Sequence, residues 1–356
     1  MFYTVTMKSL FNIIKIFPLL LLIACSSSKE ISHDTASVTD TATDSDTATD
    51  SDTATDSVTD TATDSATDLP DAPDVDAGPT IPGYRKSFSV CWTDMTCKRV
   101  FVISHGGDWN LNDNDHPYDS RAAFVRAWKL GADGIKTDFR VTKDNVGVVT
   151  HSSPFESWES SDCSGRKVEE MTAAQVTACH IYPSKTQTFQ LVADVIEDAR
   201  GKGMIMLTVK DDNFARAVEI ILEHHAQDYV FIETKMGNLS SIIPQAPDFD
   251  KVYYNAEINS PADIDTLKTI VKTIPVLFCE MDATYPDVDA KQMPEFIDTR
   301  VHPLGMRAFV SSMAYPSEKR HEGLFNEGFD VIMSYNLENG IQARKTINSK
   351  RGIDPP

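Results

Sequence analysis

The feature that most constrains the fold of this chain is a regular alternation of short apolar segments with amphipathic ones, which begins near Lys86. Residues 204–209 (MIMLTV) form a continuous apolar run that is typical of a buried parallel strand. Residues 120–130 place their apolar side chains on one helical face, with Ser120 as a cap. Parallel strands joined by crossover helices produce this alternation, and about eight such units in roughly 260 residues predict a closed (β/α)8 TIM barrel.

The same pattern predicts where the elements lie. Strands are expected at residues 99–104, 134–140, 146–150, 204–209, 229–232, 252–254, 275–278, 308–310 and 330–333. Helices are expected at residues 120–130, 189–199, 214–224 and 263–272, among others. An open doubly wound sheet is the alternative, but His105-Gly106-Gly107-Asp108 after the first strand is not the glycine-rich phosphate loop G-x-G-x-x-G. The closed barrel is therefore favoured, and its functional residues should lie where strands end.

The first 24 residues predict an export signal. Two lysines precede the apolar stretch 16–23, which is too short to span a bilayer and fits a signal peptide. Leu22-Ile23-Ala24-Cys25 resembles the lipobox of bacterial lipoproteins, which implies cleavage before Cys25 and attachment of lipid to its thiol. Together with Ser26, the resemblance implies a lipid-anchored location in the bacterial cell envelope, at the outer membrane. An ordinary signal peptide followed by a chance cysteine is the alternative.

Residues 25–85 predict a disordered acidic tether between that anchor and a folded domain at 86–356. Residues 31–84 contain thirteen Asp and no Lys or Arg, which accounts for most of the net charge of −20. Residues 34–69 repeat Asp, Thr, Ser and Ala without aromatic side chains, so they cannot form a core. A calcium-binding repeat would need glycine turns and a bidentate Glu, which the repeat lacks. A nucleic-acid partner is not expected, because binding phosphates requires clustered cations.

The cysteines fit an oxidising compartment. We expect the local pairs Cys91–Cys97 and Cys163–Cys179 to form disulfides, although spacing alone does not fix the connectivity. Cys279 ends an apolar strand-like run and is expected to be a buried thiol.

Ionisable residues stand at the ends of several predicted strands. His105 and His151 each follow a strand, Lys136 and Asp138 lie in one, and Lys210 ends the MIMLTV strand. In a barrel these side chains could all face one mouth. Two imidazoles suit acid/base chemistry near neutral pH, and the lysines would supply positive charge to a phosphoryl oxygen. A hydrogen-bonded structural histidine at each strand end is the plainer alternative.

Segments between about residues 100 and 345 resemble, in order, the motifs of glycerophosphodiester phosphodiesterases. Residues 131–138 (GADGIKTD) resemble the Gly-Ala-Asp-x-Ile-Glu-x-Asp strand of that family, and 207–210 (LTVK) resemble its Ile-Glu-Ile-Lys strand. Further resemblances lie at residues 102–107 (VISHGG), 117–124, 142–144, 148–151 (VVTH) and 328–333. The resemblance implies a TIM barrel that hydrolyses glycerophosphodiesters to an alcohol and sn-glycerol 3-phosphate.

In that family two histidines act as acid and base, and Ca²⁺ or Mg²⁺ binds between three carboxylates. The resemblance assigns the catalytic histidines to His105 and His151 and matches Lys210 to the family's lysine. With the strand positions above, we expect Lys136, Lys210 and Asp138 to contact the substrate or its phosphate. Asp138 is the one metal-binding carboxylate that is retained. Lys136 and Thr208 stand where the other two are expected, and Ser152 replaces the Asp that follows the second histidine.

These departures weaken the case for a metal. A hard cation needs several anionic oxygens, and one carboxylate beside an ammonium is a poor cage, so the cofactor stays unknown. We expect Lys136 to take the place of the metal, pair with Asp138, and present a point charge to phosphate. A rebuilt cation site in the loop after the first strand is the alternative. Its candidate ligands are Asp108, Asp113, Asp115 and Asp119.

The sequence thus predicts a phosphoric diester hydrolase that acts on glycerophosphodiesters or related phospholipid headgroups in lipid metabolism, with metal-independent catalysis as one form of the mechanism. The expected partners are a small phosphodiester or phospholipid and, through Cys25, a membrane. The alternative is a catalytically inactive barrel that binds a phosphorylated ligand at the cell surface.

Overall fold

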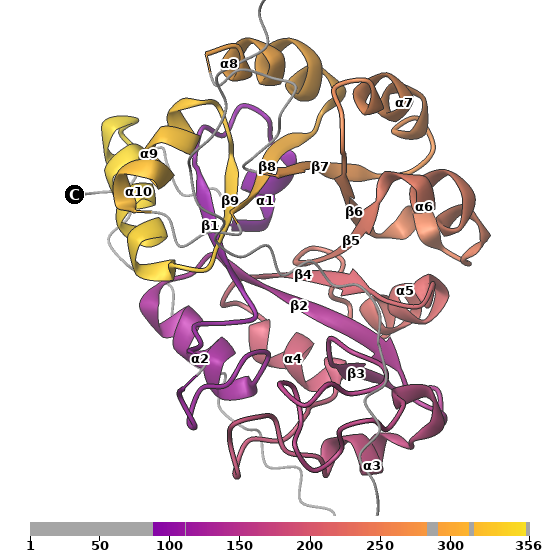
Figure 1. Ribbon diagram of the computed structural model, residues 1–356. Helices are drawn as coiled ribbons and strands as arrows, with labels where there is room; N and C mark the ends of the chain where they lie inside the picture. Colours follow the sequence, from indigo (N-terminus) through magenta and orange to yellow (C-terminus); the bar gives the residue numbers. More distant parts are fainter. Residues whose placement is uncertain (1–87, 111, 283–290, 313–316, 354–356) are drawn as a thin grey trace, which may run out of the picture. The chain divides into compact units, whose positions relative to one another are not determined.

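The structure is a computed structural model, described here for residues 88–110, 112–282, 291–312 and 317–353. The predicted signal peptide, Cys25 and the acidic tether lie outside these residues. Within them, eight parallel strands close into a barrel that helices surround, which confirms the predicted TIM barrel (Figure 1). No helix in the described ranges combines the length and apolar character that crossing a bilayer requires.

The strands of the barrel follow one another in space in the order β1-β9-β8-β7-β6-β5-β4-β2, and β2 closes the ring on β1. Their bounds are β1 (Phe101–His105), β2 (Gly134–Val141), β4 (Met204–Val209), β5 (Val230–Lys235), β6 (Tyr253–Glu257), β7 (Val276–Asp282), β8 (Arg307–Ser312) and β9 (Val331–Ser334). The α-helices are α1 (Phe88–Thr93), α2 (Arg121–Leu130), α3 (Ala173–Thr177), α4 (Val192–Ala199), α5 (Phe214–Glu223), α6 (Met236–Ser241), α7 (Asp263–Ile270), α8 (Met293–Phe296), α9 (Glu318–Asn326) and α10 (Leu337–Lys350). Short helical turns lie at Val168–Glu170, Ile243–Gln245, Phe249–Lys251, Ile297–Val301 and His302–Leu304.

One predicted strand, at residues 146–150, is not part of the barrel. The observed strand, β3 (Gly147–Val149), pairs antiparallel with the end of β2, with Phe139 opposite Val149. The chain between β2 and β3 is a tight turn closed by a 3.0 Å bond from the Thr142 N–H to the Val146 carbonyl. So short a connection permits only a hairpin, because a crossover to a parallel neighbour takes about a dozen residues or more. His151 is therefore brought to the barrel mouth by a hairpin.

Two helices show how capping and strand pairing set the boundaries. Helix α2 begins after Ser120, whose hydroxyl accepts the Ala123 N–H at 3.1 Å, and ends at Gly131, which has a φ of 99°. The helix predicted from residue 189 instead begins at Val192. The residues before it are extended, because the Gln190 carbonyl accepts the Val149 N–H at 3.0 Å.

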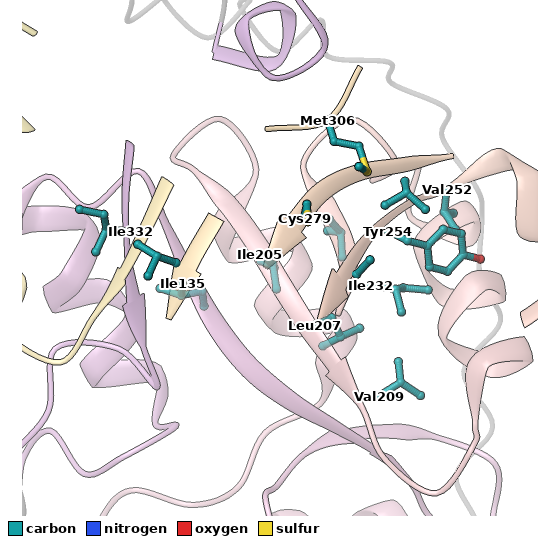
Figure 2. Close-up of a cluster of buried hydrophobic side chains, with 14 of the residues drawn as sticks. Ile135, Ile205, Leu207, Val209, Ile232, Val252, Tyr254, Cys279, Met306 and Ile332 are labelled. Carbon is teal, nitrogen blue, oxygen red and sulfur yellow. The ribbon is translucent and has the colours of Figure 1, made fainter. Parts of the chain in front are cut away.

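Apolar side chains fill the barrel at the amino-terminal ends of its strands. The cluster inside includes Phe101, Met206, Phe231, Phe278, Phe309 and Met333. A second cluster packs the outer face of the strands against the helices; Figure 2 shows part of it, with Ile205 and Leu207 on β4 and Ile232 on β5. Because the interior is filled with apolar groups, ionisable side chains can gather only toward the carboxyl ends of the strands.

The segment before β1 seals the amino-terminal end of the barrel. Trp92 of α1 is 1% exposed and its ring centroid lies 4.0 Å from that of Phe101. The buried Arg307 guanidinium donates hydrogen bonds to the carbonyls of Trp92 at 2.9 Å and Asp94 at 2.8 Å. The predicted disulfides Cys91–Cys97 and Cys163–Cys179 are both present, and Cys279 is a buried free thiol, as expected.

Candidate active site

The five residues singled out from the sequence lie together at the carboxyl end of the barrel. His105 ends β1 and stands beside Lys136 of β2, its register partner. Asp138 follows two residues later on the same face of β2, and Lys210 comes directly after β4, the other neighbour of β2. His151 follows β3. The charges of Lys136, Asp138, His151 and Lys210 all act on the His105 imidazole.

Asp138 is the centre of this arrangement. Its side chain is fully buried, and its Oδ1 accepts a hydrogen bond from Lys136 Nζ at 2.8 Å and forms an ion pair with Lys210 Nζ at 3.1 Å. The Tyr118 hydroxyl donates to the other oxygen at 3.4 Å. Burial alone would raise the pKa of Asp138, but the charges of Lys136 and Lys210 outweigh that effect and hold its pKa well below the ordinary value. Asp138 is therefore a carboxylate at neutral pH.

Lys136 is a buried cation. Its side chain is 6% exposed, and burial alone would lower its pKa. Asp138, followed by Glu233 and Asp119, more than reverses this effect and raises the pKa of Lys136 above its ordinary value. Lys136 is therefore an ammonium at neutral pH. Together, Lys136 and Lys210 bring two positive charges to one carboxylate, and this excess suits an anionic ligand.

His105 lies in an aromatic environment. Its ring stacks on Tyr335 with centroids 4.4 Å apart, and Tyr118 lies 5.6 Å away. Its Nδ1 is buried and has no hydrogen-bond partner among the described residues. Burial, followed by the charge of Lys136, holds the pKa of His105 well below 6.5, so the imidazole is neutral at neutral pH and can accept a proton.

His151 is less buried than His105 and contacts different groups. Its Nδ1 lies 3.1 Å from the Ser152 hydroxyl, and its ring centroid lies 5.5 Å from that of Trp158. Burial lowers the pKa of His151, with Lys210 and Lys136 adding to the effect and Asp138 opposing it. Both imidazoles are thus neutral in the free protein, and His105 is the harder of the two to protonate.

Sequence reasoning missed several residues of this site. Tyr335 and Trp158 lie far from His105 in the sequence, and no motif marked them. Glu233 was also missed. Thr208 stands where the family has one of its metal-binding carboxylates, and its hydroxyl donates to Glu233 Oε1 at 2.8 Å. A carboxylate therefore does lie near this position, but it comes from the neighbouring strand β5, and only the strand register shows that Thr208 and Glu233 are neighbours.

The described residues do not fit a divalent cation of the family type. Two ammonium groups already pair with Asp138 Oδ1, and their positive charges oppose binding of a cation beside this carboxylate. The alternative site in the loop after β1 is wrong, because Arg126 pairs with Asp108 at 2.6 Å and with Asp113 at 3.2 Å, while Asp119 is buried near Asp138. Across the described ranges, no group of three His, Cys, Asp or Glu side chains could hold a metal ion.

Solved structures share this fold. A glycerophosphoryl diester phosphodiesterase from Parabacteroides distasonis has a TM-score of 0.59 at 19% identity, over 73% of this chain and 91% of that one. A phosphodiesterase from Oleispira antarctica, solved with the product sn-glycerol-3-phosphate, has a TM-score of 0.56 at 16% identity, over 70% of this chain and 99% of that one.

Sequence comparison identifies the family. A curated glycerophosphodiester phosphodiesterase from Caldanaerobacter subterraneus subsp. tengcongensis is 45% identical over 53 residues, which is 15% of this chain and 20% of that relative's length. The model of the glycerophosphoryl diester phosphodiesterase family matches residues 112–299, more than half of the chain. This chain therefore belongs to the glycerophosphoryl diester phosphodiesterase family.

Proposed function

We propose that this protein hydrolyses glycerophosphodiesters or related phospholipid headgroups, and that it does so without a divalent metal. Family membership supports the reaction class. The observation that carries the metal-free mechanism is the Lys136 ammonium, 2.8 Å from Asp138 and beside His105 on the adjacent strand. In this mechanism the Lys136 ammonium supplies the positive charge that a bound metal supplies in the family.

The two imidazoles take different roles in this proposal. Lys136 and Lys210 hold the phosphodiester anion by charge-assisted hydrogen bonds. His105, which is the harder to protonate, takes a proton from the attacking oxygen, either of water or of a substrate hydroxyl. As the new P–O bond forms and the old one breaks, His151 in its protonated form gives its proton to the leaving alcohol oxygen. The bound anion favours protonation of His151, because an adjacent negative charge raises a histidine pKa.

We further propose that the protein is exported and lipid-anchored through Cys25. The lipobox-like sequence at residues 22–25 supports this, as do the two disulfides of the barrel domain, which are typical of an oxidising compartment.

The first prediction concerns metal and histidine dependence. Hydrolysis of glycerophosphocholine or lysophospholipids should persist in EDTA, whereas His105→Ala and His151→Ala should each lower kcat by about 10²–10⁴, the usual contribution of a general acid or base. His180→Ala is the matched control, because His180 is exposed and pairs with Asp162 away from the site. Loss of activity in EDTA would refute the metal-free mechanism. Binding of sn-glycerol 3-phosphate without turnover on any phosphodiester would favour the inactive binding barrel.

The second prediction concerns Lys136. Lys136→Met should lower kcat by about 10²–10³, as expected when one group that stabilises developing charge is removed. Added Ca²⁺ or Mg²⁺ should not restore the activity, because a lone Asp138 carboxylate is a poor site for a hard cation. Steady-state kinetics with each cation measures both effects. Full recovery with either cation would show that a metal, and not Lys136, supplies the charge in the reaction.

The third prediction concerns pH. Because both histidine pKa values lie below 6.5 in the free protein, with His105 the lower, kcat/KM should be bell-shaped with its maximum below pH 6.5. It falls at lower pH as His105 gains a proton and at higher pH as His151 loses one. The basic limb of kcat reports loss of the His151 proton in the substrate complex. It should lie at higher pH than the basic limb of kcat/KM, because the bound anion raises the pKa of His151. A kcat/KM maximum above pH 7 would contradict these assignments.

The fourth prediction concerns anchoring. In a bacterial host, the wild-type chain should incorporate an alkyne-labelled fatty acid and sediment with envelope membranes, and Cys25→Ser should abolish both. Cys279→Ser, which alters a buried thiol of the barrel, should be labelled like the wild type. Equal labelling of Cys25→Ser and wild type would exclude this anchor.

A further inference from the structure

A buried glutamate binds the chain segment that carries His151. Glu159 is 4% exposed and lies in the loop that follows β3. Its Oε1 accepts the Thr150 hydroxyl at 2.6 Å and the His151 N–H at 2.7 Å, and its Oε2 accepts the Ser152 N–H at 3.0 Å. One carboxylate thus gathers donors from three consecutive residues, with the histidine in the middle.

The peptide groups of His151 are held from both sides. While Glu159 accepts its N–H, the Arg140 guanidinium of β2 donates to its carbonyl at 2.9 Å and 3.1 Å. These bonds fix the point from which the imidazole extends, and the Ser152 hydroxyl beside Nδ1 restricts the orientation of the ring.

Glu159 is itself firmly anchored. Its carbonyl accepts the Tyr182 N–H at 2.8 Å, and the neighbouring Ser160 hydroxyl donates to the His180 carbonyl at 2.8 Å. The disulfide Cys163–Cys179 ties the two limbs of the same loop together. Behind it, nine buried side chains form a small core of their own, separate from that of the barrel. The loop is thus a rigid support.

A buried carboxylate in such a place is costly unless its oxygens are satisfied by donors, and here neutral donors of the histidine segment satisfy them. Among the described residues, the hydrogen bonds to the Glu159 carboxylate come from neutral donors and none comes from a cation, so this side chain contributes little to an ion-pair network. What its contacts do fix is the position of residues 150–152.

We propose that Glu159 is a positioning residue for His151, which holds the imidazole in the orientation that proton delivery to the leaving oxygen requires. This inference rests on the proposed function. Glu159 does not touch the substrate in this role. It acts through the Thr150 hydroxyl and the backbone N–H groups of His151 and Ser152.

The test is Glu159→Gln, which preserves size but turns an NH₂ group toward a backbone N–H. We expect kcat for glycerophosphocholine to fall about 10- to 100-fold, the scale of a small misplacement of a reacting group, with KM changed less than about threefold. Amide hydrogen exchange at His151 and Ser152 should become faster. Glu170→Gln is the matched control, because it makes the same chemical change in the same loop at an exposed side chain that pairs with Lys167. Its kcat should stay within about twofold of wild type.

Three outcomes would overturn the proposal: an unchanged kcat in Glu159→Gln, an equal loss in Glu170→Gln, or unaltered exchange at His151 and Ser152. If Glu159→Gln does not fold, Thr150→Val removes one donor and keeps the carboxylate, and a severalfold loss of kcat is then expected. If the wild type hydrolyses no phosphodiester, the proposed function fails. Hydrogen exchange and the affinity for sn-glycerol 3-phosphate then decide separately whether Glu159 positions His151.

Discussion

The site depends on the ion pairs of Asp138 with Lys136 and Lys210. Burying an isolated charge costs several kcal/mol, so neither the buried Asp138 nor the buried Lys136 would be stable in the barrel alone. Paired, the three groups leave an excess positive charge at the carboxyl ends of β2 and β4. Burial and this charge together keep both histidines neutral, and the charge favours binding of an anion. Removal of Asp138 would take away the main partner of the buried Lys136 ammonium, so Asp138 matters to the fold as well as to the chemistry.

A fixed ammonium differs from a bound metal in ways that affect the chemistry. It carries one charge and donates hydrogen bonds in place of empty coordination positions, so it cannot activate a bound water. Proton transfer then falls entirely to the side chains, and the orientation of each imidazole matters more. The hydrogen bonds of Glu159 and Arg140 to the His151 backbone help to fix the position of this imidazole. His105 has a different support, because its ring stacks against Tyr335.

The barrel supplies the frame on which these groups meet. Closure of β1 on β2 sets His105 beside Lys136, and the neighbouring β4 brings Lys210 to the same carboxylate. The hairpin β3 then folds back on β2 and delivers His151 from outside the ring. Of the two lysines and two histidines around Asp138, three thus come from barrel strands or their ends. The fourth, His151, comes from a hairpin that the loop after β3 holds in place.

The sequence by itself predicted the barrel and the pairing of Lys136 with Asp138, and it favoured both disulfides without fixing their connectivity. These follow from local rules: strand and helix periodicity, short cysteine spacing, and the fact that residues two apart share one face of a strand. It also placed His105 and His151 at strand ends. The antiparallel course of β3, the partnership of Thr208 with Glu233, and the contacts of Tyr335 and Glu159 with the histidines appeared only in the tertiary structure. They depend on strand register and loop path, which join residues far apart in the chain and leave no periodic pattern in it.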